Sequence, residues 1–301
     1  MAIGCNCNAG LSNTGRPNCV PIQSVTTKLI MVPLTANDGI KNYIDLTSPL
    51  PTWNSLVNEA DASKRWFPLP VFENVELPKA DSQFEEANSG RMVFLRQGKR
   101  SFSGELWAED SSPTLLSKLQ NNRCVDFGVY IVDTAGNLVG SKVNDALYPI
   151  PVDNPSFDPK YMFATDATTS KIMVAFDFDR LFDEGTMYMI TASEAGVDFN
   201  DLSGLLDVNF LNGTVGATTY TADLKLDYGT ALNLIAFSGA VSADFDLYNN
   251  TTAGTVAVSS LENLPTLGNY TFSYIAQTAG DSLTLSIDKD GYTGSVTFTA
   301  V

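Results

Sequence analysis

The sequence predicts a mainly β protein with a few short helices that ends in a β-sandwich. Strand-like runs rich in Thr, Val and Ala recur about every ten residues after Gly204, separated by Gly and Asn turns. The block Gly90–Ser141 reads as a long strand, a short helix, a second strand, a turn and a third strand. No apolar run approaches the roughly 18 residues that a membrane-spanning helix needs.

The length of 301 residues favours two folded domains. Residues 1–23 are rich in Asn, Gly, Cys and Pro and have neither helical nor strand periodicity, so we expect an irregular N-terminal arm there. Residues 24–200 are expected to form a β-rich oligomerisation domain. Residues 201–301, which are poor in charge, are expected to form the C-terminal sandwich.

The first half of the β-rich domain is predicted to alternate strands and turns. Strands are expected at Ser24–Leu34 and Lys41–Leu46, around a turn at Asn37–Gly39. A helix is expected within Pro51–Arg65, where Trp53, Leu56 and Val57 share one face. The acid-rich stretch Phe72–Ala87 is interpreted as a solvated segment, with a catalytic carboxylate pair as the alternative.

The second half contains the clearest local pattern. Arg91–Ala108 is predicted to be one long strand or a hairpin around Gln97-Gly98. Pro113–Asn122 is predicted to be a helix capped by Ser111 or Ser112, with Leu115, Leu116 and Leu119 on one stripe. Further strands are expected at Cys124–Asp133, Leu138–Val143, Tyr161–Ala164, Lys171–Asp179 and Met187–Ser193.

Eight short strands are predicted in the last hundred residues, which is typical of a β-sandwich. The region lacks the Cys…Trp…Cys pattern of antibody domains, so "immunoglobulin-like" describes its architecture only. The runs are LLDVNFL, TTYTADLKL, LNLIAFS, SADFDLY, TVAVSS, NYTFSYIA, SLTLSID and SVTFTA.

The charge and the missing histidine argue against two classes of function. With 34 acidic and 18 basic residues, the net charge of −16 opposes nucleic-acid binding over the whole surface. The chain has no histidine, so the commonest general base and transition-metal ligand are absent. We therefore expect a protein that is not an enzyme and has no cofactor, with a carboxylate-based hydrolase as the weakest alternative.

Two groups of residues resemble metal sites only in part. Cys5, Cys7 and Cys19, with Cys124 or a carboxylate as a fourth ligand, could bind zinc, but the C-x-C spacing is unusual and reduced thiols are the preferred interpretation. The acidic cluster at 177–184 fails the calcium-loop pattern because Leu181 stands at the fifth position. We assign no metal, catalytic or cofactor residue.

Four of the 18 basic residues lie within ten positions, at Arg91, Arg96, Lys99 and Arg100. They are predicted to contact an acidic surface of another protein copy or, less favoured, DNA phosphate. The alternative is a solvated hairpin edge, where charge prevents edge-to-edge aggregation.

The block Gly90–Ser141, the opening CNCNAGLSNTGRPNC and the segment YGTALNLIAFSGAVSADFDLYNNTT resemble virion structural proteins of tailed phages. The similarity is greatest to the tail-barrel ring proteins of crAss-like phages. The order RQGKRSFSGELW, SPTLLSKL, CVDFGVYIVD also looks like a tail-tube-type unit. This resemblance is one of overall sequence character, so it assigns a function to no individual residue.

The resemblance implies a tail-tube-like domain followed by an immunoglobulin-like sandwich, in a subunit of a stacked ring in the virion tail. The ring would be a homo-oligomer, dodecameric by resemblance, that contacts neighbouring tail or portal ring proteins. Double-stranded DNA would pass through its lumen without specific binding, and no membrane would be involved. The alternative function is an adhesin or glycan-binding module with exposed tyrosines such as Tyr248, Tyr270 and Tyr292.

Overall fold

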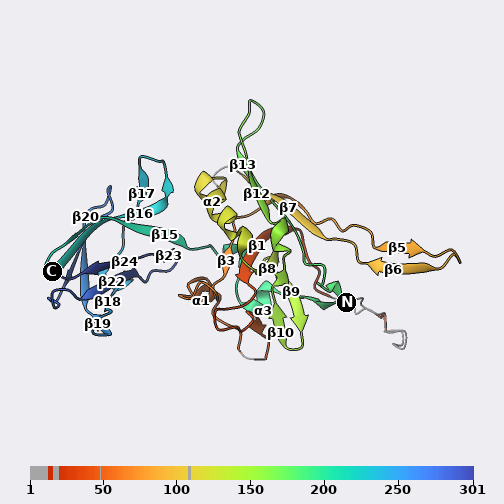
Figure 1. Cartoon of the computed structure of the whole chain (residues 1–301), viewed down its shortest axis with the longest axis horizontal. Helices are drawn as coiled ribbons and strands as arrows, with labels where there is room; N and C mark the ends of the chain where they lie inside the picture. The colour runs from red at the N-terminus through yellow and green to blue at the C-terminus, as the bar shows by residue number, and fades with distance from the viewer. Residues whose placement is uncertain (1–12, 16–19, 48, 108–109) are drawn as a thin grey trace. The chain divides into compact units, whose positions relative to one another are not determined.

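The computed structural model describes residues 13–15, 20–47, 49–107 and 110–301. Strands make up 47% and helices 12% of the chain, which confirms the prediction of a mainly β protein with few short helices (Figure 1). The chain divides into two compact units. The first comprises the described residues up to Trp53 together with Asp61–Leu202, and the second comprises Asn54–Ala60 and Ser203–Val301.

The larger sheet of the first unit is antiparallel and has eight strands in the order β2-β10-β9-β8-β1-β3, with β11 beside β8 and β14 beside β9. The β-branched run at the start of the domain forms β1, which pairs with β8 along most of its length. The strands are β1 (Thr26–Pro33), β2 (Ile44–Asp45), β3 (Phe67–Pro68), β8 (Phe127–Asp133), β9 (Leu138–Val143), β10 (Ala146–Tyr148), β11 (Ile150–Pro151) and β14 (Met187–Ile190).

A four-stranded sheet shares a hydrophobic core with the larger sheet. Its order is β12 (Asp158–Met162), β13 (Lys171–Asp177), β7 (Ser101–Trp107) and β4 (Glu73–Glu76). Residues alternate between core and solvent along β7 and β13, as expected for strands with one buried face. Phe102 and Phe176 stack with ring centroids 4.9 Å apart, and both belong to the core that also contains Leu29 and Phe127.

Helix α2 (Pro113–Asn121) confirms the predicted amphipathic helix. The Ser112 hydroxyl accepts a hydrogen bond from the Leu115 amide at 3.2 Å, so Ser112 is the N-cap. Leu119 is fully buried, and Leu115 and Leu116 pack against the same core. The apolar stripe therefore attaches the helix to the first unit.

Strand β8 is buried on both faces. One face joins the core shared with the four-stranded sheet. Aromatic side chains cover the other face: the Trp66 ring lies 5.0 Å from that of Tyr130, and Trp53 packs edge-on against Phe199 at 4.8 Å. These contacts join residues far apart in sequence, so local periodicity could not show them.

Several predicted boundaries before residue 201 are wrong. The helix expected within Pro51–Arg65 is limited to α1 (Trp53–Val57), and the Asp61 carboxylate instead accepts hydrogen bonds from the Ser63 amide and hydroxyl in a turn. The acid-rich stretch Phe72–Ala87 contains strands β4 and β5 (Gln83–Glu86). The remaining short helices with described bounds are α3 (Ala192–Ala195), η2 (Asn122–Cys124), η3 (Asn154–Ser156), η4 (Glu184–Thr186), η5 (Phe199–Asp201) and η6 (Ser242–Asp244).

The second unit consists of two sheets around one core, with orders β20-β21-β16-β15-β23, where β17 pairs with β16, and β19-β18-β22-β24. Every predicted C-terminal run contains a strand, and TVAVSS divides into β19 and β20. The strands are β15 (Leu206–Val215), β16 (Thr219–Gly229), β17 (Leu234–Ala236), β18 (Phe245–Asn249), β19 (Gly254–Val256), β20 (Val258–Leu264), β21 (Asn269–Tyr274), β22 (Ser282–Ile287), β23 (Tyr292–Thr293) and β24 (Ser295–Thr299).

Candidate functional site on a two-stranded arm

A long hairpin leaves the four-stranded sheet of the first unit. Near the sheet, β4 pairs with β7; farther out, β5 pairs only with β6 (Met92–Arg96). Figure 1 shows this outer part extending away from the body of the unit. We call residues 80–98 the arm.

The arm begins where its two chain segments approach very closely. A Cβ atom on Gly98 would lie 1.5 Å from the Ala80 carbonyl oxygen, so no larger residue fits without moving the backbone. Beside it, the Ala80 amide donates to the Lys99 carbonyl at 2.8 Å. The predicted alternative of a hairpin around Gln97-Gly98 is wrong, because Gly98 lies at the base of the arm.

The turn of the hairpin lies at residues 87–90. The Gly90 amide donates to the Ala87 carbonyl at 2.8 Å, and the Ala87 amide donates to the Arg91 carbonyl at 2.9 Å. Gly90 has φ of +77°, a left-handed conformation that glycine adopts at little cost. The predicted single strand Arg91–Ala108 is therefore two strands, β6 and β7, on one side of this hairpin.

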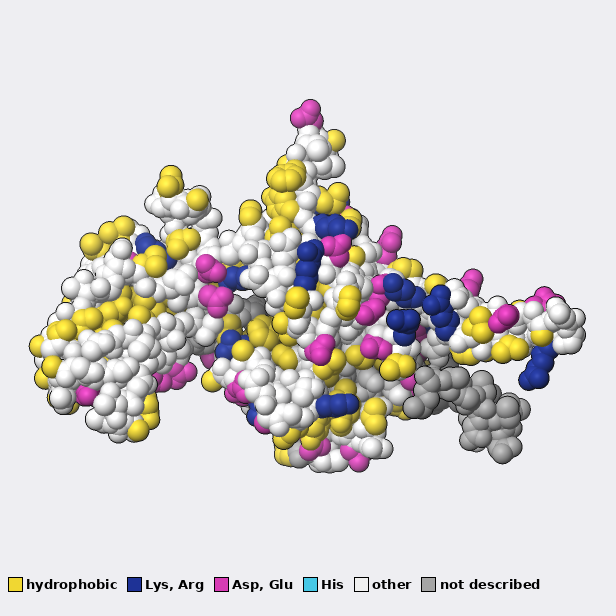
Figure 2. Space-filling model, viewed as in Figure 1, with side chains coloured by type: hydrophobic (Ala, Val, Ile, Leu, Met, Phe, Trp, Pro, Cys, Tyr) yellow, Lys and Arg dark blue, Asp and Glu magenta, His cyan; other side chains and the backbone are white. Residues whose placement is uncertain are grey.

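The arm exposes an unusual amount of apolar surface. All residues of β5 and β6 are exposed. Phe84 and Phe94 are opposite each other in the ladder, and their rings meet edge-on at 5.6 Å, yet the side chains remain 52% and 40% exposed. Met92, Val93 and Leu95 are also exposed. Figure 2 shows apolar side chains along the arm.

The structure divides the four predicted interface residues into two pairs. Arg91 and Arg96 lie on the arm, where the Arg96 Nε donates to the Gln83 side chain at 2.7 Å. Lys99 and Arg100 lie at its base and form ion pairs with Asp177 and Glu184, respectively. Only the first pair thus forms no ion pair with another described residue.

Two residues of the acidic cluster at 177–184, Asp177 and Glu184, are the acidic partners in these ion pairs. The Glu184 carboxylate accepts from the Arg100 Nε at 2.8 Å and from the Lys79 Nζ at 2.7 Å, and these hydrogen bonds hold its pKa below the usual value against the effect of burial. Asp177 also accepts from the Ser101 hydroxyl at 2.6 Å. Among the described residues, no group of three or more Cys, Asp or Glu side chains is arranged to hold a metal ion.

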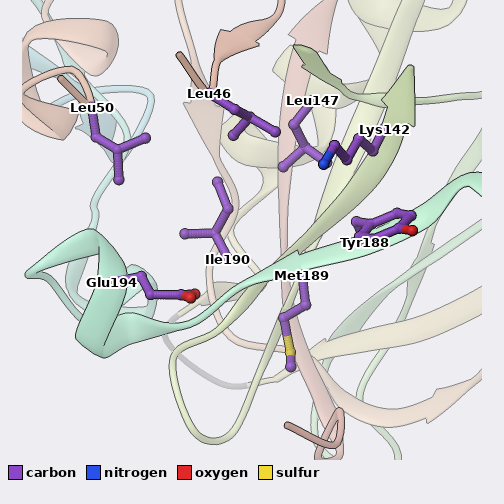
Figure 3. Close-up of a pocket in the computed structure, with 8 residues that line it drawn as sticks. All are labelled: Leu46, Leu50, Lys142, Leu147, Tyr188, Met189, Ile190 and Glu194. Carbon is purple, nitrogen blue, oxygen red and sulfur yellow. The ribbon is translucent and has the colours of Figure 1, made fainter. Parts of the chain in front are cut away.

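An apolar pocket of about 290 Å³ opens on the larger sheet of the first unit (Figure 3). Its two charged side chains lie at opposite ends and have local partners. The Lys142 Nζ lies 5.1 Å from the centre of the Tyr188 ring, and Glu194 accepts from the Thr191 amide and hydroxyl in a capping box. The other lining residues are Leu46, Leu50, Leu147, Met189 and Ile190. The lining contains no Ser, Thr or Cys, and its carboxylate is occupied as a helix cap.

Most of the cysteines considered for zinc are outside the described residues. Cys5, Cys7 and Cys19 fall there, as does most of the irregular N-terminal segment expected at residues 1–23. Cys124 is described and is an exposed free thiol. Neither the preferred interpretation as reduced thiols nor the zinc alternative is tested.

The tyrosines of the glycan-binding alternative do not form an exposed platform. Tyr270 is fully buried, and its hydroxyl accepts from the Ala240 amide. The Tyr292 ring packs edge-on against Phe237 at 4.9 Å. Only Tyr248 of the three is an exposed side chain, at 43%. The expectation of an exposed Tyr270 is wrong, because alternation in β21 turns this residue into the core.

No helix in the described part of the chain is both long and apolar enough to cross a bilayer. No family model matches the sequence, and neither the curated proteins nor the solved structures include a match to it. The arm is the feature of the described structure that most clearly indicates a function.

Proposed function

We propose that this chain is a non-enzymatic structural subunit of a homo-oligomeric ring in the short tail of a phage, part of the conduit for DNA. The observation that carries the assembly role is the arm. The virion setting rests on the resemblance of the Gly90–Ser141 block and its flanking segments to phage tail proteins.

The arm has the properties of a segment that becomes stable in an assembly. A two-stranded hairpin alone is marginally stable in water, and a further strand or a packed face is needed to stabilise it. Within the described part of the chain, both edges and both faces of β5 and β6 are open, and five apolar side chains are exposed on them. Exposed apolar strands of this kind are typical of protein contact sites.

The rest of the molecule suits a conduit better than a catalyst. The net charge of −16 would let DNA slide through a lumen without strong binding, because phosphate contacts need Lys and Arg. In this proposal the first unit, two sheets flanked by α2, is the tail-tube-like domain. The second unit, two sheets around one core, is the immunoglobulin-like sandwich.

The test is the oligomeric state of the purified full-length chain over a wide range of concentrations, measured by mass photometry and sedimentation and followed by negative-stain electron microscopy. The proposal expects one large, concentration-dependent species that appears as rings with a central opening. A chain that remains monomeric up to its solubility limit would contradict it. A matched variant with Phe84→Ser and Phe94→Ser should form the same species less readily.

A further inference from the structure

The two strands of the arm carry opposite charge. From Asp81 to Glu86 there are three carboxylates and no cation, and from Arg91 to Arg96 there are two guanidinium groups and no carboxylate. The first segment contains β5 and the second contains β6. The arm therefore has an acidic strand and a basic strand side by side.

Each strand also has an open hydrogen-bonding edge. The sheet that contains β5 and β6 has these two strands only, so each pairs on one side with the other and has no strand on its outer side within the described structure. The charges along these edges are available for a partner. Neither Glu85, Glu86 nor Arg91 forms a side-chain hydrogen bond or ion pair with another described residue, and Arg96 contacts only the neutral Gln83 side chain.

The charges decide which edges fit together. In antiparallel pairing, side chains directly opposite one another interact, and like charges there are destabilising. Pairing β5 with β5 of a second copy would bring Glu85 and Glu86 close to their equivalents, and pairing β6 with β6 would do the same for Arg91 and Arg96. Pairing β6 of one copy with β5 of the next places guanidinium groups beside carboxylates instead.

We propose that the arm adds edge to edge to the arm of a neighbouring copy, with the basic strand β6 of one copy antiparallel to the acidic strand β5 of the next. This inference deepens the proposed function and rests on it for the ring. The contact uses two different edges, so it is heterologous and each copy still offers a free edge of each kind. Repeated around a ring, it forms one continuous sheet that closes on itself and leaves no strand edge open.

The proposal is tested with two charge-reversal variants of the full-length chain. Glu85→Lys with Glu86→Lys makes both strands basic, and Arg91→Glu with Arg96→Glu makes both strands acidic. Each variant alone would place like charges across every arm contact. We expect the concentration for half-maximal assembly, measured by mass photometry and sedimentation, to rise about tenfold or more for each.

An equimolar mixture of the two variants supplies the decisive observation. In the mixture every arm contact can again join an acidic strand to a basic one, in alternating order. We expect assembly to return to within about threefold of the wild-type concentration. Recovery would also show that the arms of both variants remain folded, because each chain in the mixture carries the same substitutions as it does alone. The quadruple variant, with both strands reversed in one chain, should assemble by itself.

A control for the variant Arg91→Glu with Arg96→Glu makes the same change in net charge elsewhere in the first unit. Lys41 and Arg180 are exposed and lie outside the arm, so Lys41→Glu with Arg180→Glu should leave assembly unchanged. Normal assembly by either arm variant, or no recovery in the mixture, would overturn the proposal. Rings formed normally by both arm variants would overturn this contact and leave the ring proposal standing, whereas a strictly monomeric wild-type chain would contradict both.

Discussion

Phe84 and Phe94 face each other across the outer end of a hairpin, with ring centroids 5.6 Å apart, and no other described ring lies against either of them. Such an edge-to-face pair contributes about 0.5–1.5 kcal/mol beyond the burial of its surface. The pair helps to hold β5 and β6 together, but about half of the Phe84 side chain is still exposed. A neighbour that covered this pair would complete its burial.

Replacing both phenylalanines should therefore affect the arm without affecting the core. For Phe84→Ser with Phe94→Ser, we expect faster amide hydrogen exchange at residues 83–96 and an unchanged unfolding transition of the first unit. Tryptophan fluorescence reports on that unit, since Trp53, Trp66 and Trp107 all belong to it. A large fall in the unfolding midpoint would show that the pair stabilises the core.

Gly98→Ala should displace the arm at its base. The added methyl group would collide with the Ala80 backbone, and a clash with backbone cannot be relieved by a side-chain rotation. We expect loss of protection at the Ala80 amide and throughout the arm, with a cost of about 1–3 kcal/mol confined to this segment. Hydrogen exchange measures both. Gly254→Ala is the control, since the nearest atom to its Cβ would be the Thr252 hydroxyl oxygen at 3.8 Å.

Arg100 and Arg91 should respond differently to neutralisation. Arg100→Gln removes the 2.8 Å contact with Glu184, and we expect a loss of up to about 1 kcal/mol in the free energy of unfolding that shrinks as salt is added. Arg91→Gln should leave the free energy of unfolding unchanged and weaken assembly. Urea denaturation at low and high salt, beside sedimentation of both variants, separates the two roles. Equal effects of the two substitutions on unfolding would contradict the division of the basic cluster.

Asp133 should make the first unit sensitive to acid. Burial raises its pKa, but hydrogen bonds from the Ser24 amide and from Asn137 and Ala135 outweigh burial and leave the pKa below the usual value. A carboxylate with a lowered folded-state pKa stabilises the fold above its unfolded pKa of about 4, and this contribution is lost as the pH falls through the folded-state value. We expect Asp133→Asn to cost about 1–3 kcal/mol at neutral pH.

The difference between wild type and Asp133→Asn should then shrink below about pH 4, measured by urea denaturation with tryptophan fluorescence. Asp145→Asn, at an exposed position, is the control. A constant difference down to about pH 2 would show that the charge of Asp133 does not matter.

Lys28 should make the stability of the first unit depend on pH in the alkaline range. It is 4% exposed, and its Nζ donates to the carbonyls of Asn200 and Leu202 at 2.8 and 2.5 Å. Lys28→Met keeps the aliphatic volume but leaves two carbonyls without this donor, so we expect a cost of about 2–4 kcal/mol. Burial lowers the pKa of Lys28 despite the nearby Asp201 and Asp198 carboxylates.

Because the unfolded chain then binds more protons than the folded one, the free energy of unfolding should rise with pH between the lowered folded-state pKa and the unfolded value of about 10.4. Lys28→Met should lack this rise, whereas Lys41→Met at an exposed position should keep it. A wild-type chain without the rise would show that Lys28 keeps its proton throughout that range.

Local sequence patterns predicted the helices and strands whose caps, turns and alternation lie within a few residues of one another. The helix α2 was predicted because Ser112, Pro113 and the leucine stripe are all local. The strands of the second unit were predicted because alternation and turn residues occur within each run. The strand β5 was missed because the five acidic residues of Phe72–Ala87 were interpreted as part of a solvated segment. The turn residues Ala87–Gly90, between two strand-like runs, were the available signal.

The sequence by itself determined the mainly β class, the α2 cap, the acidic charge and the location of a basic cluster. Only the tertiary structure decided which cations of that cluster are already paired, because Asp177 and Glu184 approach Lys99 and Arg100 from more than seventy positions away in the chain. It also decided which strands are covered. β8 is buried on both faces by distant aromatic side chains, whereas β5 and β6 extend beyond the core and stay exposed. Burial depends on the packing of distant segments, and local sequence patterns do not encode which of those segments meet.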